Sequence, residues 1–582
     1  MLIRLLSYAH QYKKYTVAAM LCVMAEAVFE LIIPLLMADI VDVGVANGDT
    51  RFIFQRGALM VVCAVLALIL GIGSSRFSAV CGQGLGAELR KEEYRKLQGF
   101  SFSNIDHFRT SSLITRMTSD VTNIQNAVSS GMRPFCRSPI MLVMAVGSSF
   151  YINPGLAVVF FVAAPLLGIL LFLIIRKVQP QYGKMQQAID LVNRIIQENL
   201  TAIRVVKAYV KGDYETEKFR QVNENLQSIS EKSFRTAALN MPAMQYVMYA
   251  TILCILWFGG GMIQAGDMQV GELTGFLSYV LQVLNSLMMI SNVFLMLSRS
   301  LASGARILEV IDEKVDLTDE QAEDRQVTEG SVTFDHVWFK YKKDAKEYVL
   351  SDISFHIEAG QTVGIIGQTG SAKTTLIQLI PRLYEATRGQ VLVDGVPVEK
   401  YPMKHLRDAI AVVLQKNTLF SGTVKDNLKW GKADATDEEI QEACRIACVD
   451  EFIGRLENGY DTQLGQGGVN VSGGQKQRLC IARAILKHPK VLILDDSTSA
   501  VDTATEAKLR RGLAEKLPDM TRIIIAQRIT SVQEADQILV LDDGKIHGIG
   551  THDQLLETDE IYRDIYESQQ KGSLEEAKEV AE

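Results

Sequence analysis

Hydrophobic residues form long uninterrupted runs in the first half of the chain. An α-helix rises 1.5 Å per residue, so about 20 residues cross the hydrocarbon core of a bilayer. Residues 156–175 meet this length without a single charged side chain. We predict six membrane-spanning helices, which return the chain to the side on which it starts, at residues 15–37, 58–72, 139–152, 156–175, 247–263 and 273–297.

Basic residues mark one side of this predicted membrane domain. Lys and Arg cluster in residues 4–14, 90–96 and 176–184, whereas the loops 38–50, 151–155 and 264–272 contain neither. Because cytoplasmic flanks carry the excess of positive charge, both termini are predicted to be cytoplasmic. The tripeptide at residues 25–27 resembles a signal-peptidase site, but the later spans favour a retained first helix. We expect a multi-pass protein of the cell membrane, in a bacterium the inner membrane.

Two segments between the spans are too long to be simple loops, residues 74–132 and 176–241. Apolar residues recur at three- and four-residue spacing in them, as at Leu191, Ile195 and Ile196, which indicates helix. We expect helices that extend into the cytosol and reverse near residues 103–110 and 211–215. Residues 106–109 and 212–214 are candidate contact points with the rest of the protein, although exposed helix-helix turns would have the same composition.

The pattern changes in the second half, where Val332, Phe334, Val337 and Phe339 nearly alternate with polar residues and indicate strands. The fold class is therefore a multi-domain membrane protein, with an all-α six-helix transmembrane domain followed by an α/β domain. The predicted domain limits are 1–311 for the membrane domain, 312–330 for an acidic, solvated linker, 331–566 for the α/β domain and 567–582 for a polar tail.

Composition excludes several other classes of protein. With 48% hydrophobic and 22% charged residues the chain is not disordered, and its net charge of −7 gives no basic surface for nucleic acid. Eight cysteines in 582 residues do not form a disulfide framework. Cys444 and Cys448 share a helix face, and we interpret them as small core residues rather than metal ligands.

A glycine-rich loop in the α/β half has the form of a phosphate-binding P-loop. A buried strand at residues 361–366 leads into it and a helical pattern follows. In such a loop backbone N–H groups and a helix N-terminus hold phosphates, the lysine adds positive charge, and the following threonine reaches Mg²⁺. The segment consists of Gly367, Gln368, Thr369, Gly370, Ser371, Ala372, Lys373, Thr374 and Thr375. The strict pattern has glycine where this chain has Ala372, so the turn is expected to be strained or displaced.

A second apolar strand, residues 491–495, ends in Asp495 and is followed by Asp496. A carboxylate in this position holds Mg²⁺ together with the P-loop hydroxyl. A core strand with a polar end is the alternative, and the order of the two motifs along the chain disfavours it.

Residues 471–478, Val-Ser-Gly-Gly-Gln-Lys-Gln-Arg, lie between these motifs and resemble the signature motif of ABC transporters. Tyr341, Gln415, Asp502 and the Ala526-Gln527-Arg528 segment occupy the order of that family's other nucleotide-site elements. The resemblance covers nearly the whole chain and implies a half-transporter of the exporter type that uses ATP and Mg²⁺. It also implies that two nucleotide domains sandwich two ATP molecules, each between one subunit's P-loop and the other subunit's signature segment.

The resemblance assigns roles to residues one by one. Tyr341 would stack on adenine, although a strand tyrosine alone is more often packing. Gln415 would contact Mg²⁺ and sense the membrane domain, and Asp502 would lie at the dimer interface. The signature residues that would receive the γ-phosphate of the partner's ATP are Ser472, Gly473, Gly474 and Gln475.

Four residues depart from the family pattern, and all four bear on hydrolysis. Asp496 stands where active members carry the glutamate that polarises water, and Gln527 stands where they carry a switch histidine. Ala372 replaces a P-loop glycine, and Gln466 replaces a glutamate before the signature. An aspartate side chain is about 1.5 Å shorter than a glutamate, and glutamine cannot become cationic. We predict a site that binds ATP and hydrolyses it poorly.

The intact signature segment serves the other subunit's ATP. The chain is therefore predicted to pair with a second, non-identical half-transporter that supplies the catalytic glutamate and switch histidine, as in bacterial heterodimeric multidrug exporters. A homodimer would have two impaired sites.

The sequence gives little information about the transported substrate. Glu26 and Glu30 are one turn apart in the first span, where they could bind cationic amphipathic drugs. The favoured alternative is that they lie near the aqueous vestibule or pair with a basic residue such as Arg137. Met288 and Met289 either adapt to varied ligands or pack helices. The leading function is export of drug-like, lipophilic or amphipathic small molecules. A lipid or peptide exporter, or an ATP-gated membrane protein that does not pump, is the alternative.

Overall fold

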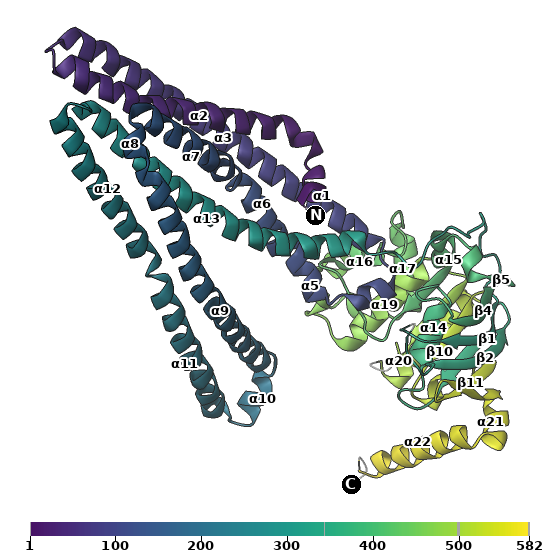
Figure 1. Cartoon of the computed structure of the whole chain (residues 1–582). Helices are drawn as coiled ribbons and strands as arrows, with labels where there is room; N and C mark the ends of the chain where they lie inside the picture. The colour runs from purple at the N-terminus through teal and green to yellow at the C-terminus, as the bar shows by residue number, and fades with distance from the viewer. Residues whose placement is uncertain (1, 343, 498–500, 580–582) are drawn as a thin grey trace. The chain divides into compact units, whose positions relative to one another are not determined.

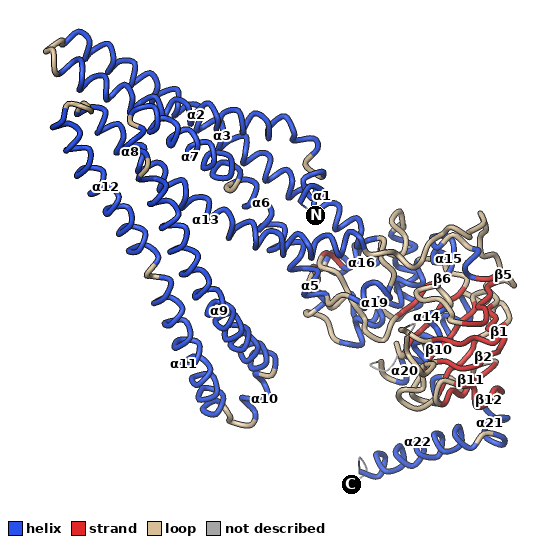
Figure 2. Tube along the Cα trace, viewed as in Figure 1, coloured by secondary structure: helices blue, strands red, loops and turns tan. Residues whose placement is uncertain are grey.

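The structure is a computed structural model that describes residues 2–342, 344–497 and 501–579. The chain divides into two compact units. The first unit contains the chain up to Gln98 and then Thr110–Glu313, and the second contains Gly99–Arg109 and the chain from Lys314 onward. Figure 2 shows that the first unit is helical and that all strands belong to the second.

In the described part of the chain the first unit has six helical stretches that are long and apolar enough to cross a membrane, which confirms the predicted six-helix domain. Its helices are α1 (Leu2–Ser7), α2 (Lys13–Asp39), α3 (Thr50–Gln98), α5 (Thr110–Thr115), α6 (Val121–Ser129), α7 (Met132–Ile152), α8 (Pro154–Ala157), α9 (Val159–Thr201), α10 (Ile203–Ala208), α11 (Gly212–Ala237), α12 (Asn240–Ala265) and α13 (Val270–Asp312).

Several of these helices are longer than a bilayer requires. Helix α3 has 49 residues, which at 1.5 Å per residue is about 73 Å and more than twice the hydrocarbon thickness. Helix α9 packs along α11 far beyond the apolar run, and α10 joins the two at their tip (Figure 1). The predicted helical extensions are therefore present.

The core of the first unit forms where α2 and α13 pack closely. Tyr279 of α13 is fully buried and donates a hydrogen bond from its hydroxyl to the Leu31 carbonyl at 2.6 Å. Gly271 permits the approach, because a Cβ there would lie only 2.4 Å from the Ala38 carbonyl oxygen. Phe160 of α9 stacks on Phe276 of α13 and completes the apolar centre.

The second unit is the predicted α/β domain, built on a six-stranded sheet of order β12-β11-β3-β10-β9-β6 and a four-stranded antiparallel sheet of order β2-β1-β4-β5. The six-stranded sheet consists of β3 (Thr362–Ile366), β6 (Ile410–Val413), β9 (Val491–Asp495), β10 (Thr521–Ile525), β11 (Gln537–Asp542) and β12 (Lys545–Gly550). The antiparallel sheet consists of β1 (Val332–Phe339), β2 (Leu350–Ile357), β4 (Arg388–Val393) and β5 (Val396–Pro397).

Helices flank these sheets, and a two-stranded ribbon of β7 (Gly422–Thr423) and β8 (Gln463–Leu464) lies beside them. The α-helices of the second unit are α4 (Phe102–His107), α14 (Lys373–Leu379), α15 (Met403–Ala409), α16 (Val424–Leu428), α17 (Asp437–Ile446), α18 (Asp450–Ile453), α19 (Gly473–Leu486), α20 (Thr503–Lys516), α21 (His552–Thr558) and α22 (Glu560–Glu579).

The parallel strands explain why the predicted site residues lie close together. Strands β3, β10, β9 and β6 are neighbours and run parallel, so their carboxyl ends meet at one edge of the sheet. Ligands of open α/β sheets bind at this edge. The P-loop follows β3, Asp495 ends β9, Gln527 comes two residues after β10, and Gln415 two residues after β6.

Most residues of the acidic segment 312–330 are exposed, and a few contacts tie it to the rest of the second unit. Leu317 and Val327 are buried, at 5% and 8% exposure. The Met403 backbone N–H donates to the Asp319 carboxylate at 3.0 Å, and the Glu323 N–H donates to the Lys400 carbonyl at 2.8 Å. Its two apolar side chains and these hydrogen bonds hold the segment in place, which its acidic composition did not indicate.

Candidate nucleotide site

The P-loop connects β3 to α14 and wraps around the ammonium group of Lys373. This group donates to the carbonyls of Gly367 and Gln368 at 2.8 Å each and to the Ser371 hydroxyl at 3.2 Å. Burial lowers the pKa of Lys373, and the nearby carboxylates of the β9 end oppose that shift. Gln368, Thr369 and Gly370 are exposed at the loop surface, where backbone groups can meet a phosphate.

Gly367 must be glycine because the loop runs close to β11. A Cβ at this position would lie 2.1 Å from the Leu541 carbonyl oxygen and 2.7 Å from the Ser371 hydroxyl. Movement of the Ser371 side chain could relieve the second contact but not the first, because the Leu541 oxygen belongs to the backbone.

Ala372 adopts the left-handed conformation that its position in the P-loop demands, with φ 69° and ψ 22°. An L-residue with a Cβ pays about 1–2 kcal/mol in this region, whereas glycine does not. The strain expected from the sequence is therefore present.

Replacing Ala372 by glycine should relieve this strain. We expect the variant to bind ATP with several-fold higher affinity, equivalent to about 1 kcal/mol, without a comparable change in hydrolysis rate. Equilibrium binding of a fluorescent ATP analogue to the purified protein measures the effect. Unchanged or weaker affinity would show that the bound loop does not keep this conformation.

Thr374 and Asp495 form the pair expected to hold Mg²⁺. The Thr374 hydroxyl lies 3.1 and 3.0 Å from the two carboxylate oxygens of Asp495, which is 2% exposed. Burial raises the pKa of Asp495, and the hydrogen bond from Thr374 opposes that shift. A hydroxyl and a carboxylate at the end of a parallel strand are hard oxygen donors, which fit Mg²⁺ with water completing its shell.

Asp496 is held by two glutamine side chains. The Gln527 amide donates to Asp496 Oδ2 at 2.8 Å, and the Gln415 amide lies 3.5 Å from the same oxygen. Burial raises the pKa of Asp496, while the hydrogen bonds from Gln415 and Gln527 oppose it. The backbone of Asp496 is also left-handed, with φ 48°. The short carboxylate thus points one oxygen to amide donors that cannot carry a proton away.

Tyr341 lies beside the P-loop helix. Its hydroxyl is 2.8 Å from the Thr375 hydroxyl, and its ring meets the Tyr384 ring edge-on at 5.1 Å between centroids. The Tyr341 side chain is 45% exposed, which leaves ring surface on which an adenine can stack.

The signature residues begin a different helix. Ser472 is the N-cap of α19, accepting from the Gln475 N–H at 3.3 Å while its own N–H donates to the Gln475 side chain at 2.8 Å. Gly473 and Gly474 form the first turn of this 14-residue helix, whose free N–H groups favour an anion. Gln466 lies in a short 3₁₀-helix, Gln466–Gly468, before it.

Asp502 caps α20 by accepting a hydrogen bond from the Thr505 N–H at 2.9 Å, and this bond lowers its pKa. Residues 498–500, shortly before Asp502, lie outside the described residues.

Two groups of site residues emerge. The carboxyl edge of the sheet brings together Lys373, Thr374, Gln415, Asp495, Asp496 and Gln527, with Tyr341 joined through Thr375. The second group lies on other elements: Ser472, Gly473, Gly474 and Gln475 begin α19, and Asp502 caps α20.

Sequence reasoning missed Tyr384. It contacts the helix α4 through a hydrogen bond from its hydroxyl to Asp106 Oδ2 at 2.6 Å, and Phe102 packs on its ring at 5.9 Å. Burial, followed by the bond to Asp106, raises the pKa of Tyr384. Nothing in the local sequence distinguishes this tyrosine, because its partner is far away along the chain.

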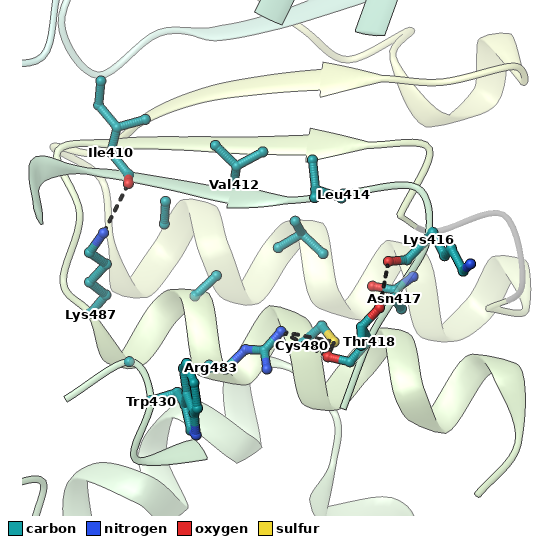
Figure 3. Close-up of a pocket in the computed structure, with 14 residues that line it drawn as sticks. Ile410, Val412, Leu414, Lys416, Asn417, Thr418, Trp430, Cys480, Arg483 and Lys487 are labelled. Carbon is teal, nitrogen blue, oxygen red and sulfur yellow. Dashed lines mark hydrogen bonds between the residues drawn. The ribbon is translucent and has the colours of Figure 1, made fainter. Parts of the chain in front are cut away.

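A cavity of about 270 Å³ beside the segment after Gln415 was also not foreseen (Figure 3). It lies between β6, residues 416–418 and α19, where Arg483 donates to the Thr418 carbonyl at 3.2 Å. At its other end Lys487 donates to the Ile410 carbonyl at 3.1 Å. The exposed ring of Trp430 forms one wall.

Six apolar helices joined to a P-loop α/β domain define a membrane transport protein with an ATP-binding domain. The comparisons agree: residues 16–287 match the family model of the ABC transporter transmembrane region, and residues 350–499 match the family model described as ABC transporter.

Full-length relatives share both parts. An uncharacterized ABC transporter ATP-binding protein of Bacillus subtilis, YfiB, is 39% identical over 97% of this chain and 98% of its own length. A probable multidrug resistance ABC transporter ATP-binding/permease protein of the same organism, YheI, is 32% identical over 97% and 96%. The solved structure of a bacterial Atm1-family ABC exporter with ATP bound superposes with a TM-score of 0.81, at 26% identity over 96% and 98% of the two chains. The chain therefore belongs to the ABC transporter family and has the fold of an exporter half-transporter.

Proposed function

We propose that this chain is one subunit of a heterodimeric exporter that moves drug-like, lipophilic or amphipathic compounds out of the cell. Its own P-loop side holds ATP and hydrolyses it slowly, and its signature segment completes a competent site on the partner. The observation that carries this proposal is the position of Asp496, whose short carboxylate is engaged by Gln527. The similarity to YheI supports the substrate class.

In this proposal Thr374 and Asp495 hold Mg²⁺, which neutralises phosphate charge when bound. Lys373 adds a positive charge beside the phosphates, and the Tyr341 ring stacks on adenine. Hydrolysis needs a base or positioned carboxylate near the attacking water. Asp496 is short by one carbon-carbon bond, and Gln527 can donate a hydrogen bond but cannot exchange a proton at neutral pH. The ATP site on this chain's P-loop therefore retains its nucleotide, while the partner's glutamate and histidine hydrolyse the ATP at the second site.

The chain connects α4 to the helices α3 and α5 of the first unit, and α4 contacts residues beside the ATP site within the second unit. Asp106 accepts from Tyr384, Tyr384 packs edge-on against Tyr341, and Tyr341 shares a hydrogen bond with Thr375 next to the P-loop. We propose that closing of the nucleotide domains reaches the membrane helices through these contacts. Residues 106–109, which the sequence marks as a candidate contact point, would then couple ATP binding to movement of the membrane helices.

Replacing Asp106 by alanine tests this link. A hydrogen bond to a charged group contributes about 1.5–3 kcal/mol, so transport should fall about tenfold or more while ATP binding stays unchanged. Replacing the exposed Asp434 of the same unit by alanine is the matched control, and it should alter neither quantity. Transport and nucleotide affinity falling together would instead indicate a damaged nucleotide domain.

The second predicted contact point lies at the tip formed by α10 and the start of α11. Tyr209, Val210 and Tyr214 there are 73%, 87% and 66% exposed. Large apolar side chains gathered at a helix tip are typical of a surface that another protein covers. We propose that the partner subunit's nucleotide domain covers this tip, and that this chain's cavity beside Trp430 receives the partner's corresponding tip.

The proposal is tested by purifying the chain from its native membrane. It predicts a stoichiometric second ABC half-transporter, both termini in the cytoplasm, and ATPase activity stimulated by hydrophobic drugs. Stimulation by lipids or peptides alone would favour a lipid or peptide exporter. Nucleotide-dependent conductance without substrate accumulation would contradict pumping.

A further inference from the structure

Four charged side chains form an ion-pair cluster inside the membrane domain. Glu26 and Glu30 of α2 face Arg133 and Arg137 of α7. Arg133 contacts Glu26, Arg137 contacts Glu30, and Arg137 also lies 3.2 Å from Glu26. The pairing with Arg137, one of the arrangements that the sequence left open, is therefore present, and Arg133 is an unforeseen second partner.

The four side chains are electrically balanced and border two cavities. Glu26, Glu30 and Arg133 line one of about 730 Å³. The Glu26 side chain itself is 3% exposed, and a Cβ at Gly71 of α3 would lie 3.2 Å from its Oε1. On the other side of the cluster the side chains of Glu30 and Arg137 are 28% and 23% exposed. Glu26 therefore has two arginine partners and is nearly buried, whereas Glu30 has a single arginine and borders open space on the Arg137 side.

That space is a cavity of about 680 Å³ between α2, α7, α12 and α13. Glu30 and Arg137 line it together with the amides of Gln282 and Asn285, and the Gln282 carbonyl oxygen is buried with no hydrogen-bond partner in the described part of the chain. Apolar and adaptable side chains line the remainder, among them Met141, Met241, Met288 and Met289. A cavity of this size holds a small amphipathic molecule.

The charge balance restricts which head group can enter. A cation bound to Glu30 would release Arg137 toward Glu26, leaving one carboxylate with two arginines and an excess positive charge. An anion bound to Arg137 would leave Glu30 without its arginine. Either excess is costly in a membrane interior, where charges are poorly screened. A zwitterion can insert between Glu30 and Arg137 so that both side chains keep an opposite charge.

We propose that this cavity is a binding site for zwitterionic amphiphiles, whose cationic group contacts Glu30, whose anionic group contacts Arg137 and whose apolar chain lies among the methionines. The inference rests on the proposed export function and names its substrate class. A membrane phospholipid with a zwitterionic head group and a soluble inner salt share this chemistry.

Binding of matched probes tests the proposal without ATP. The full complex, in nanodiscs of anionic phosphatidylglycerol, is titrated with radiolabelled decylphosphocholine, decyltrimethylammonium and decyl sulfate, which share one chain and differ in charge. We expect the zwitterion to bind about tenfold or more tightly than either ion. Competition by a phosphatidylcholine added to the nanodisc would indicate a lipid source, and competition only by a decyl sulfobetaine a soluble one.

Variants give the proposal a second, independent test. Glu30→Gln leaves the cluster with two arginines and one carboxylate, and this excess positive charge should shift the preference to decyl sulfate. Arg137→Gln frees Glu30 while Arg133 still balances Glu26, and it should shift the preference to decyltrimethylammonium. Glu224→Gln on the exposed surface of α11 is the control and should leave the zwitterion preferred.

Equal affinity for the three probes in the unaltered protein would overturn the inference, as would variants that keep the original preference. These outcomes are separate from the proposed function. If the complex exports compounds without a head-group preference, only the inference about zwitterions is contradicted. If it binds zwitterions but transports nothing, only the proposed export function is contradicted.

Discussion

Lengthening the carboxylate of Asp496 to glutamate should activate ATP hydrolysis at this chain's own P-loop. Asp496 ends about 1.5 Å short of the position a glutamate carboxylate reaches, and misplacement of about 1 Å can cost on the order of 10²-fold in rate. We expect Asp496→Glu, assembled with the native partner, to raise hydrolysis at this site by about 10²-fold.

The structure adds a condition to this prediction. Gln527 donates to Asp496 at 2.8 Å and would also bind a longer carboxylate in its place. The double variant Asp496→Glu with Gln527→His should therefore exceed the single variant, because histidine can accept and return a proton near neutral pH.

The matched control makes the same chemical change one residue earlier. Asp495→Glu lengthens the carboxylate that meets the Thr374 hydroxyl and should lower activity, since it disturbs the proposed Mg²⁺ position. Single-turnover hydrolysis, with the partner's catalytic glutamate replaced by glutamine, isolates this site. A rate no higher in Asp496→Glu than in the unaltered chain would show that another group limits hydrolysis.

Blocking the signature segment should have the opposite and larger effect on the complex. Gly473 begins α19, and an aspartate there would bring a carboxylate to the place proposed for the partner's γ-phosphate. We expect Gly473→Asp to reduce the ATPase of the complex by about 10²- to 10³-fold, the cost of losing a donor to transition-state charge. Lys373→Met, which weakens this chain's own P-loop, should leave most of that activity.

Steady-state ATPase of the two variants, each paired with the native partner, decides between the subunit arrangements. Gly454→Asp is the control, because a side chain there meets nothing within 4 Å. In a homodimer with two equivalent sites, the Lys373 and Gly473 variants would both abolish activity.

Local patterns predicted the parts of the structure that depend on local physics. The six spans follow from hydrophobic length, and the P-loop follows from a strand, a glycine loop and a helix that are consecutive in sequence. The position of Ala372 in the left-handed region could also be anticipated, because the loop needs glycine-like backbone there.

Contacts between distant segments could not be predicted in this way. The pairing of Arg133 with Glu26 depends on how α2 and α7 pack, and the bond between Asp106 and Tyr384 joins residues 278 positions apart. Gln527 and Asp496 were both recognised as departures from the family pattern, but their hydrogen bond arises from the pairing of β9 with β10. Long-range register and packing are absent from any short stretch of sequence.

The state of the nucleotide on this chain during turnover tests the central claim most directly. The purified complex, hydrolysing 8-azido-ATP labelled at both the α- and γ-phosphorus, is photo-cross-linked and its two chains are separated. We predict that this chain retains as much γ-label as α-label, whereas the partner loses its γ-label. Loss of the γ-label from this chain at the rate of overall turnover, or recovery of a rapidly hydrolysing homodimer, would contradict the account.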